Sequence, residues 1–93
     1  MQHVEIYTKS WCPYSVRAKA LLTARNLEFT DIDVTADAER EAEMIARAGR
    51  SSVPQVFIDG EHVGGYDDLA GLDARAGLDR IVAAGVEAAV SGG

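Results

Sequence analysis

The chain has almost none of the cysteine that small cross-linked proteins use. Cys12 is the only cysteine in 93 residues, and a single thiol cannot form a disulfide within one chain. Stability must therefore come from packing, and this cysteine usage is typical of a reducing compartment. We expect a cytoplasmic protein.

The sequence also lacks long apolar runs and a surplus of positive charge. No window holds the roughly 18 apolar residues that a membrane-spanning helix needs. Residues 1–5 have neither the basic flank nor the apolar stretch of a secretory signal. The formal net charge of −6 disfavours nucleic-acid binding, because phosphates need a basic face. We expect neither a membrane nor a nucleic acid as a partner.

What the chain does contain is typical of a small globular protein. Hydrophobic residues make up 47% and charged residues 26% of the sequence, which are ordinary proportions for a soluble domain. A length of 93 residues suits one modest core. We expect a single domain over residues 1–93.

Hydrophobic periodicity predicts a strand, a helix, a strand and a helix in the first half. Strands are expected over 3–8 and 27–34, the second with its later half buried, and a helix over 13–26 lies between them. A second helix is expected to begin at Thr35 or Asp37 and to end at Gly49. Its apolar face would consist of Ala42, Ile45 and Ala46.

The second half begins with a hairpin. Residues 55–58 and 61–63 read as strands joined by the turn pair Asp59-Gly60. Asp67 and Asp68 are placed to start a helix, and a last amphipathic segment covers 78–90 before a frayed tail at 91–93. The order predicts an α/β, thioredoxin-like fold: a four-stranded mixed sheet, β-α-β-α-β-β-α plus a C-terminal helix, with helices on both faces.

Cys12 lies where the first strand passes into the first helix. The unpaired N–H groups of a helix's first turn carry partial positive charge and stabilise a thiolate. Lys9 and Arg17 lie nearby, and Lys19 and Arg25 add to a basic first quarter of the chain. We expect a lowered thiol pKa, a nucleophilic sulfur and a small anionic partner.

Val53-Pro54 supplies a second feature of the site. In a thioredoxin-like fold, a proline at the start of the third strand faces the thiol. In the cis form it would present the N–H and C=O of Val53 to a bound peptide backbone, as an added strand edge does.

Four segments together carry a family resemblance. Lys9, Trp11-Cys12-Pro13-Tyr14, Ser52-Val53-Pro54 and Gly64-Gly65-Tyr66-Asp67-Asp68 occur in the order and spacing that resemble a glutaredoxin, most closely the bacterial glutaredoxin 3 group. The resemblance covers Met1 to about Arg80. It implies the thioredoxin fold, glutathione as cosubstrate, and thiol-disulfide exchange on glutathionylated proteins by a monomer that needs no metal.

The resemblance also implies roles for individual residues. Lys9 would face the glycine carboxylate of glutathione, Tyr14 would flank the sulfur, and Val53 would pair with the cysteinyl backbone. Asp67 and Asp68 would hold the γ-glutamyl end, through helix N–H groups and a carboxylate that takes the ammonium. The implied catalytic set is Cys12, Tyr14 and Ser15. The implied glutathione-binding set is Lys9, Cys12, Tyr14, Ser52, Val53, Pro54, Gly65, Tyr66, Asp67 and Asp68.

Three positions depart from the family pattern. Ser52 stands where threonine is usual, and Tyr66 replaces a cysteine of some relatives. Glu41 falls where a glutamine or a basic residue often contacts the glycine carboxylate. Either Arg40 substitutes for that contact, or the contact is absent.

Ser15 stands three residues after Cys12, where a redox motif would have a second thiol. A serine hydroxyl cannot resolve a mixed disulfide, so Cys12 must act alone by a monothiol route. A naturally monothiol enzyme and a Cys-to-Ser variant of a dithiol enzyme both fit this residue. Two other functions stay open: a dimer holding a [2Fe-2S] cluster through Cys12 and glutathione, and an interaction module with a vestigial thiol.

Overall fold

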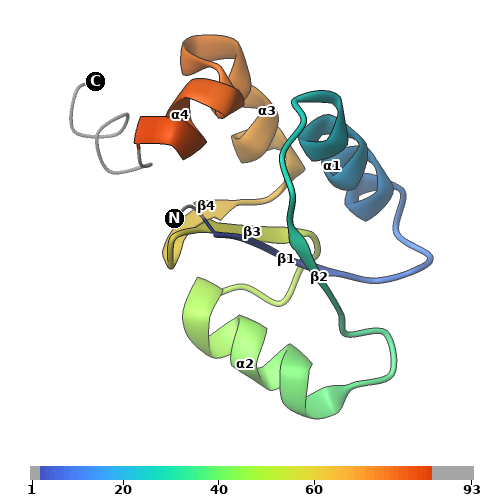
Figure 1. Cartoon of the computed structure of the whole chain (residues 1–93). Helices are drawn as coiled ribbons and strands as arrows, with labels where there is room; N and C mark the ends of the chain where they lie inside the picture. The colour runs from blue at the N-terminus through green and yellow to red at the C-terminus, as the bar shows by residue number, and fades with distance from the viewer. Residues whose placement is uncertain (1–2, 85–93) are drawn as a thin grey trace.

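A computed structural model describes residues 3–84 of the chain (Figure 1). Its elements follow the predicted order: β1 (Val4–Thr8), α1 (Pro13–Ala24), β2 (Thr30–Asp33), α2 (Ala38–Ala48), β3 (Gln55–Ile58), β4 (Glu61–Gly64), α3 (Tyr66–Ala76) and α4 (Leu78–Ala84). The predicted extension of the last helix to Val90 and the tail at 91–93 lie outside the described residues. No helix within residues 3–84 has the length and apolar character to cross a bilayer.

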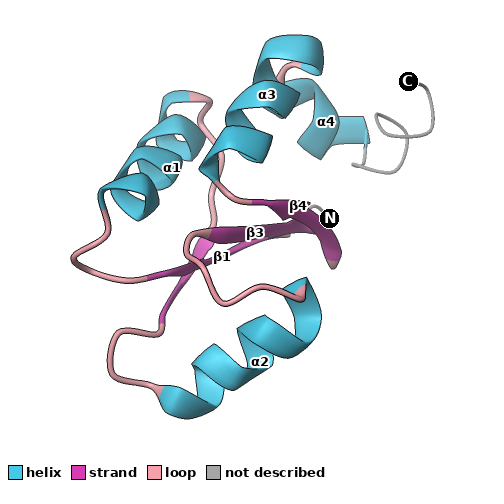
Figure 2. Cartoon of the chain, turned by 180° about the vertical axis from the view of Figure 1, so that it is seen from behind, coloured by secondary structure: helices cyan, strands magenta, loops and turns pink. Residues whose placement is uncertain are grey.

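The four strands form one mixed sheet in the order β2-β1-β3-β4. β1 pairs with β2 in parallel, and β3 pairs antiparallel with both β1 and β4. Both views of the molecule show α1, α3 and α4 on one face of the sheet and α2 on the other (Figures 1 and 2). The thioredoxin-like architecture predicted from the sequence is therefore confirmed.

The core divides between the two faces of the sheet. Side chains alternate along β1, so that Val4 and Ile6 pack under α1, α3 and α4, while Tyr7 packs on the α2 side. The smaller α2-side cluster consists of Tyr7, Val34, Met44 and Phe57. Both clusters converge on β1 and β3, the central strands, and these are the strands that lead into the Cys12 and Pro54 segments.

Local signals position several element ends as predicted. Pro13 occupies the first turn of α1. Of the two candidate caps for α2, Asp37 accepts the N–H of Arg40 at 3.0 Å, so Asp37 is the cap. Asp59 and Gly60 have φ values of 52° and 83°, which a two-residue hairpin turn of this kind requires.

The prediction for the second strand is wrong in two respects. The strand, β2, covers only residues 30–33, and its side chains are mostly exposed. Val34, just after the strand, is the buried residue of this segment. The physical reason is that β2 lies at an edge of the sheet, where one short strand is incompletely covered.

The predicted apolar face of α2 is also wrong. Ala42, Ile45 and Ala46 are all exposed. The helix instead buries Met44 and presents Arg47, whose guanidinium lies 4.0 Å from the ring centroid of Phe57. A planar cation can cover an aromatic ring, and apolar periodicity alone does not reveal this.

Asp73 joins three helices, and its loss should destabilise the fold. Its carboxylate accepts two hydrogen bonds from Arg25, which caps the end of α1, at 2.9 and 2.7 Å, and one from the N–H of Leu78 at the start of α4, at 3.0 Å. We expect Asp73→Ala to lower the free energy of unfolding by about 1 to 3 kcal/mol, because the buried N–H loses its partner. Urea denaturation measures this loss. Glu28→Ala, at an exposed acid, is the control, and equal midpoints for the two variants would contradict the assignment.

Candidate active site

Cys12 caps the amino end of α1, as the sequence predicts. Its N–H donates to the carbonyl of Lys9 at 3.1 Å, and its own carbonyl accepts the N–H of Val16 at 3.2 Å. The thiol donates to the carbonyl of Val53 at 3.6 Å, across from the start of β3. The Val53–Pro54 peptide bond is cis. The sulfur and the proline segment therefore face each other, although 41 residues separate Cys12 from Val53.

The surroundings of Cys12 lower the pKa of its thiol. Burial is the largest single influence and raises the pKa, but four favourable contacts together outweigh it. These are the N–H and the hydroxyl of Ser15, the N–H of Tyr14, and the charge of Lys9. The first-turn amides of α1 therefore favour the thiolate, as a helix amino terminus should.

Ser15 is fully buried and has a direct part in this environment. Its hydroxyl oxygen accepts the N–H of Lys9 at 3.4 Å, and the same hydroxyl lowers the pKa of Cys12. Serine at this position thus removes a resolving thiol but supplies a hydrogen-bond donor to the sulfur.

We expect Ser15→Ala to raise the pKa of Cys12. Loss of the hydroxyl donor removes a contact that favours the charged form, so the thiolate fraction at neutral pH should fall. Ultraviolet thiolate absorbance followed against pH measures the change. Thr23→Ala, at an exposed position of the same helix, should leave the titration unchanged. A titration curve for Ser15→Ala that overlays the parent curve would remove the serine from this role.

The basic field predicted around Cys12 is largely cancelled by acids from other elements. Lys9 pairs with Glu41 at 2.9 Å, Lys19 with Asp31 at 2.8 Å, and Arg25 with Asp73 at 2.7 Å. The guanidinium of Arg17 lies 5.3 Å from the ring centroid of Tyr14. The charge of Lys9 still lowers the thiol's pKa.

A groove of about 320 Å³ lies beside the thiol. Its lining comes from the start of α1, the loop before β3 and the start of α3, and comprises Tyr14, Arg50, Ser52, Val53, Pro54, Gly65, Tyr66, Asp67 and Asp68. The residues expected to bind glutathione are thus brought together here, except Lys9 and Cys12; the thiol of Cys12 contacts the groove residue Val53, and Lys9 is not among the lining residues. Three large apolar side chains on either side of Cys12 in the sequence are exposed: Trp11, Tyr14 and Val16.

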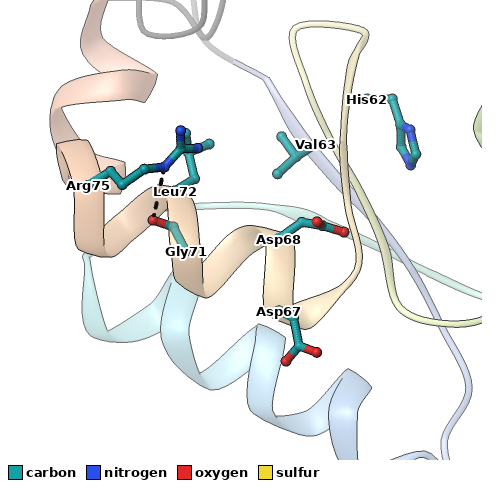
Figure 3. A pocket seen from close by; sticks show the side chains of 7 residues that line it. All are labelled: His62, Val63, Asp67, Asp68, Gly71, Leu72 and Arg75. Atoms are coloured by element: carbon teal, nitrogen blue, oxygen red, sulfur yellow. Dashed lines mark hydrogen bonds between the residues drawn. The ribbon is translucent and has the colours of Figure 1, made fainter. Parts of the chain in front are cut away.

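Asp67 and Asp68 occupy the first turn of α3. Their carboxylates point in different directions (Figure 3). Asp68 accepts the N–H of Gly65 at 3.0 Å and pairs with Arg50 at 3.3 Å. Both aspartates also border a second cavity, of about 290 Å³, between β4 and α3. Asp68 therefore has a local structural role in addition to its position in the groove.

Three residues near the groove were not predicted from the sequence. Arg50 lines the groove directly. Gln55, which is fully buried, donates from its amide nitrogen to the carbonyl and the hydroxyl of Ser52, at 3.0 and 3.2 Å, and its amide oxygen lies 2.7 Å from Nε2 of His62. His62 lies on β4 at an exposed position, and this hydrogen bond had no local sequence signal. Glutamine in the otherwise apolar run 55–58 is the only hint.

The family model for glutaredoxins matches residues 4–63. The chain belongs to the glutaredoxin family. It is 52% identical to glutaredoxin 3 of Escherichia coli K12 over 82 residues, which cover 88% of this chain and 99% of the relative.

Solved glutaredoxin structures share the fold. The solution structure of a glutaredoxin from Brucella melitensis matches with a TM-score of 0.75 and 49% identity, over 86% of this chain and 87% of that one. A crystal structure of a buckwheat glutaredoxin-glutathione complex matches with a TM-score of 0.80 and 24% identity, over 88% and 77% of the two chains. Family membership makes this glutaredoxin a thiol-disulfide oxidoreductase.

Proposed function

We propose that this glutaredoxin reduces protein-glutathione mixed disulfides by a monothiol mechanism through Cys12, with glutathione as cosubstrate. The single observation that carries the proposal is the position of the Cys12 sulfur. It lies at the amino end of α1, with a lowered pKa, and 3.6 Å from the carbonyl of Val53. The buckwheat glutaredoxin, which shares this fold, was solved as a complex with glutathione, and this supports glutathione as the ligand.

The reaction consists of two exchange steps. In the first, the Cys12 thiolate attacks the glutathione sulfur of the mixed disulfide, and the S–S bond to the substrate protein breaks. The substrate leaves as a thiolate, and Cys12 is held as a disulfide with glutathione. In the second, the thiolate of a free glutathione attacks the bound glutathione sulfur, which releases oxidised glutathione and regenerates the Cys12 thiolate. Ser15 takes no part in electron transfer.

The groove residues would orient the glutathione moiety during both steps. In this proposal the backbone of Val53 pairs with the cysteinyl unit, while Ser52, Pro54, Gly65 and Tyr66 shape the groove around it. Tyr14 flanks the sulfur, Lys9 attracts the glycine carboxylate, and Asp67 and Asp68 hold the γ-glutamyl end. The exposed surface of Trp11, Tyr14 and Val16 is available for contact with the substrate protein.

We expect the single domain of residues 1–93 to act as a monomer without a bound metal. Because the reaction consumes reduced glutathione, it needs a reducing compartment, and we place it in the cytoplasm.

A coupled assay tests the proposed function. A glutathionylated protein is incubated with this glutaredoxin, glutathione, glutathione reductase and NADPH, and consumption of NADPH is followed. We expect turnover that depends on glutathione concentration, from a colourless monomer. A brown dimer with visible absorption bands and no turnover would instead favour cluster binding, and a colourless inactive protein would favour an interaction module.

A further inference from the structure

Lys9 is already paired within the protein. Its ammonium lies 2.9 Å from a carboxylate oxygen of Glu41, with the two side chains 22% and 34% exposed. It also lies 5.7 Å from the ring centroid of Trp11. Partial burial reduces solvent screening, so this pair is stronger than one between two fully exposed side chains.

This ion pair adjoins the reacting sulfur. The carbonyl of Lys9 accepts the N–H of Cys12, and the charge of Lys9 acts on the thiol. Glu41 reaches this position from α2, on the opposite face of the sheet from α1 (Figures 1 and 2). Arg40, considered above as a substitute, turns away and pairs with Glu43 at 3.0 Å. No cation from α2 therefore replaces the one that Glu41 neutralises.

A carboxylate ligand at Lys9 must share the ammonium with the carboxylate of Glu41. Two like charges close to one cation repel each other, which offsets part of the attraction. An amide at the same place has no such penalty, since its carbonyl can accept from Lys9 while its N–H donates to Glu41. Glu41 thus acts against an anionic ligand end and tolerates a neutral one.

We propose that Glu41, through its ion pair with Lys9, is a specificity-determining residue. It weakens the preference of the site for substrates that place a free carboxylate beside the reacting cysteine. This inference rests on the proposed function. It implies that the protein accepts disulfides of cysteinyl peptides in which that end is an amide, as in a continuing peptide chain, about as readily as disulfides of glutathione itself.

The test compares two small substrates that differ only at this end. One is the mixed disulfide of glutathione with 2-mercaptoethanol, and the other is the same disulfide with the glycine carboxylate converted to an amide. The ratio of kcat/KM for the carboxylate over the amide is measured at a saturating concentration of free glutathione. For the parent protein we expect a ratio near one. For Glu41→Gln we expect the ratio to rise about three- to tenfold, through the carboxylate substrate alone.

Two further variants isolate the cause. Glu39→Gln removes an exposed acid from the first turn of the same helix and changes the net charge equally, so it should leave the ratio unchanged. In a Lys9→Gln background, Glu41→Gln should no longer raise the ratio by this amount, because the shared cation is gone.

The outcomes separate this inference from the proposed function. Turnover of both substrates with the same ratio in the parent and in Glu41→Gln overturns only the role of Glu41. An equal rise in the Lys9→Gln background overturns the route through Lys9. Absence of turnover of either disulfide by the parent protein overturns the proposed function, and the inference with it.

Discussion

Cys12→Ser should reduce turnover of a glutathionylated protein to the rate measured without enzyme. The sulfur is the only group in the site able to attack a disulfide, because a hydroxyl is a poor nucleophile toward sulfur. The chain has no other cysteine to substitute for it. The coupled glutathione assay measures the loss.

Ser15→Ala provides the matched comparison for this variant. It changes the residue three positions away but leaves the nucleophile in place, so it should keep turnover above background with a changed pH dependence. Equal activity of the Cys12→Ser variant and the parent protein would show that the thiol does not carry the reaction.

Gly64→Ala should have the largest effect on stability. Gly64 has a φ of 124°, a conformation that residues with a Cβ rarely adopt. A Cβ there would also lie 2.7 Å from Cγ and 2.9 Å from Cβ of Asp68. We expect a loss of about 2 to 3 kcal/mol or more in the free energy of unfolding, together with a higher KM for the mixed disulfide as Asp68 is displaced. Urea denaturation and steady-state kinetics measure the two effects.

Gly71→Ala is the control for this prediction. Gly71 lies inside α3, and a Cβ there meets nothing within 4 Å. Replacing a glycine within a helix by alanine should stabilise the protein by up to about 1 kcal/mol, and KM should not change. If Gly64→Ala behaved like Gly71→Ala, the close approach of β4 to Asp68 would have no energetic consequence.

The features that could be predicted from the sequence are those with short-range causes. Pro13 and Asp37 mark helix starts, and Asp59-Gly60 forms a turn through its own backbone preferences. The position of Cys12 at a strand-to-helix junction follows from the same local signals. Because these signals do not depend on distant packing, the element order and the position of the thiol at the amino end of α1 were predicted correctly.

The features that the sequence did not reveal depend on long-range contacts. Glu41 meets Lys9, and Arg50 meets Asp68, only after the elements have packed together. Counting basic residues in the first quarter of the chain therefore overestimated the charge near the thiol. The face of α2 that packs on the sheet was mispredicted for a related reason, because the contact of Arg47 with Phe57 depends on the neighbouring sheet.

Intact-mass measurement after incubation with oxidised glutathione tests the central claim most directly. The account predicts that the chain gains the mass of one glutathione, that dithiothreitol removes it, and that peptide mapping places it on Cys12. A chain that stays unmodified under these conditions, although iodoacetamide alkylates the same cysteine, would contradict the claim that this sulfur lies beside a groove for glutathione.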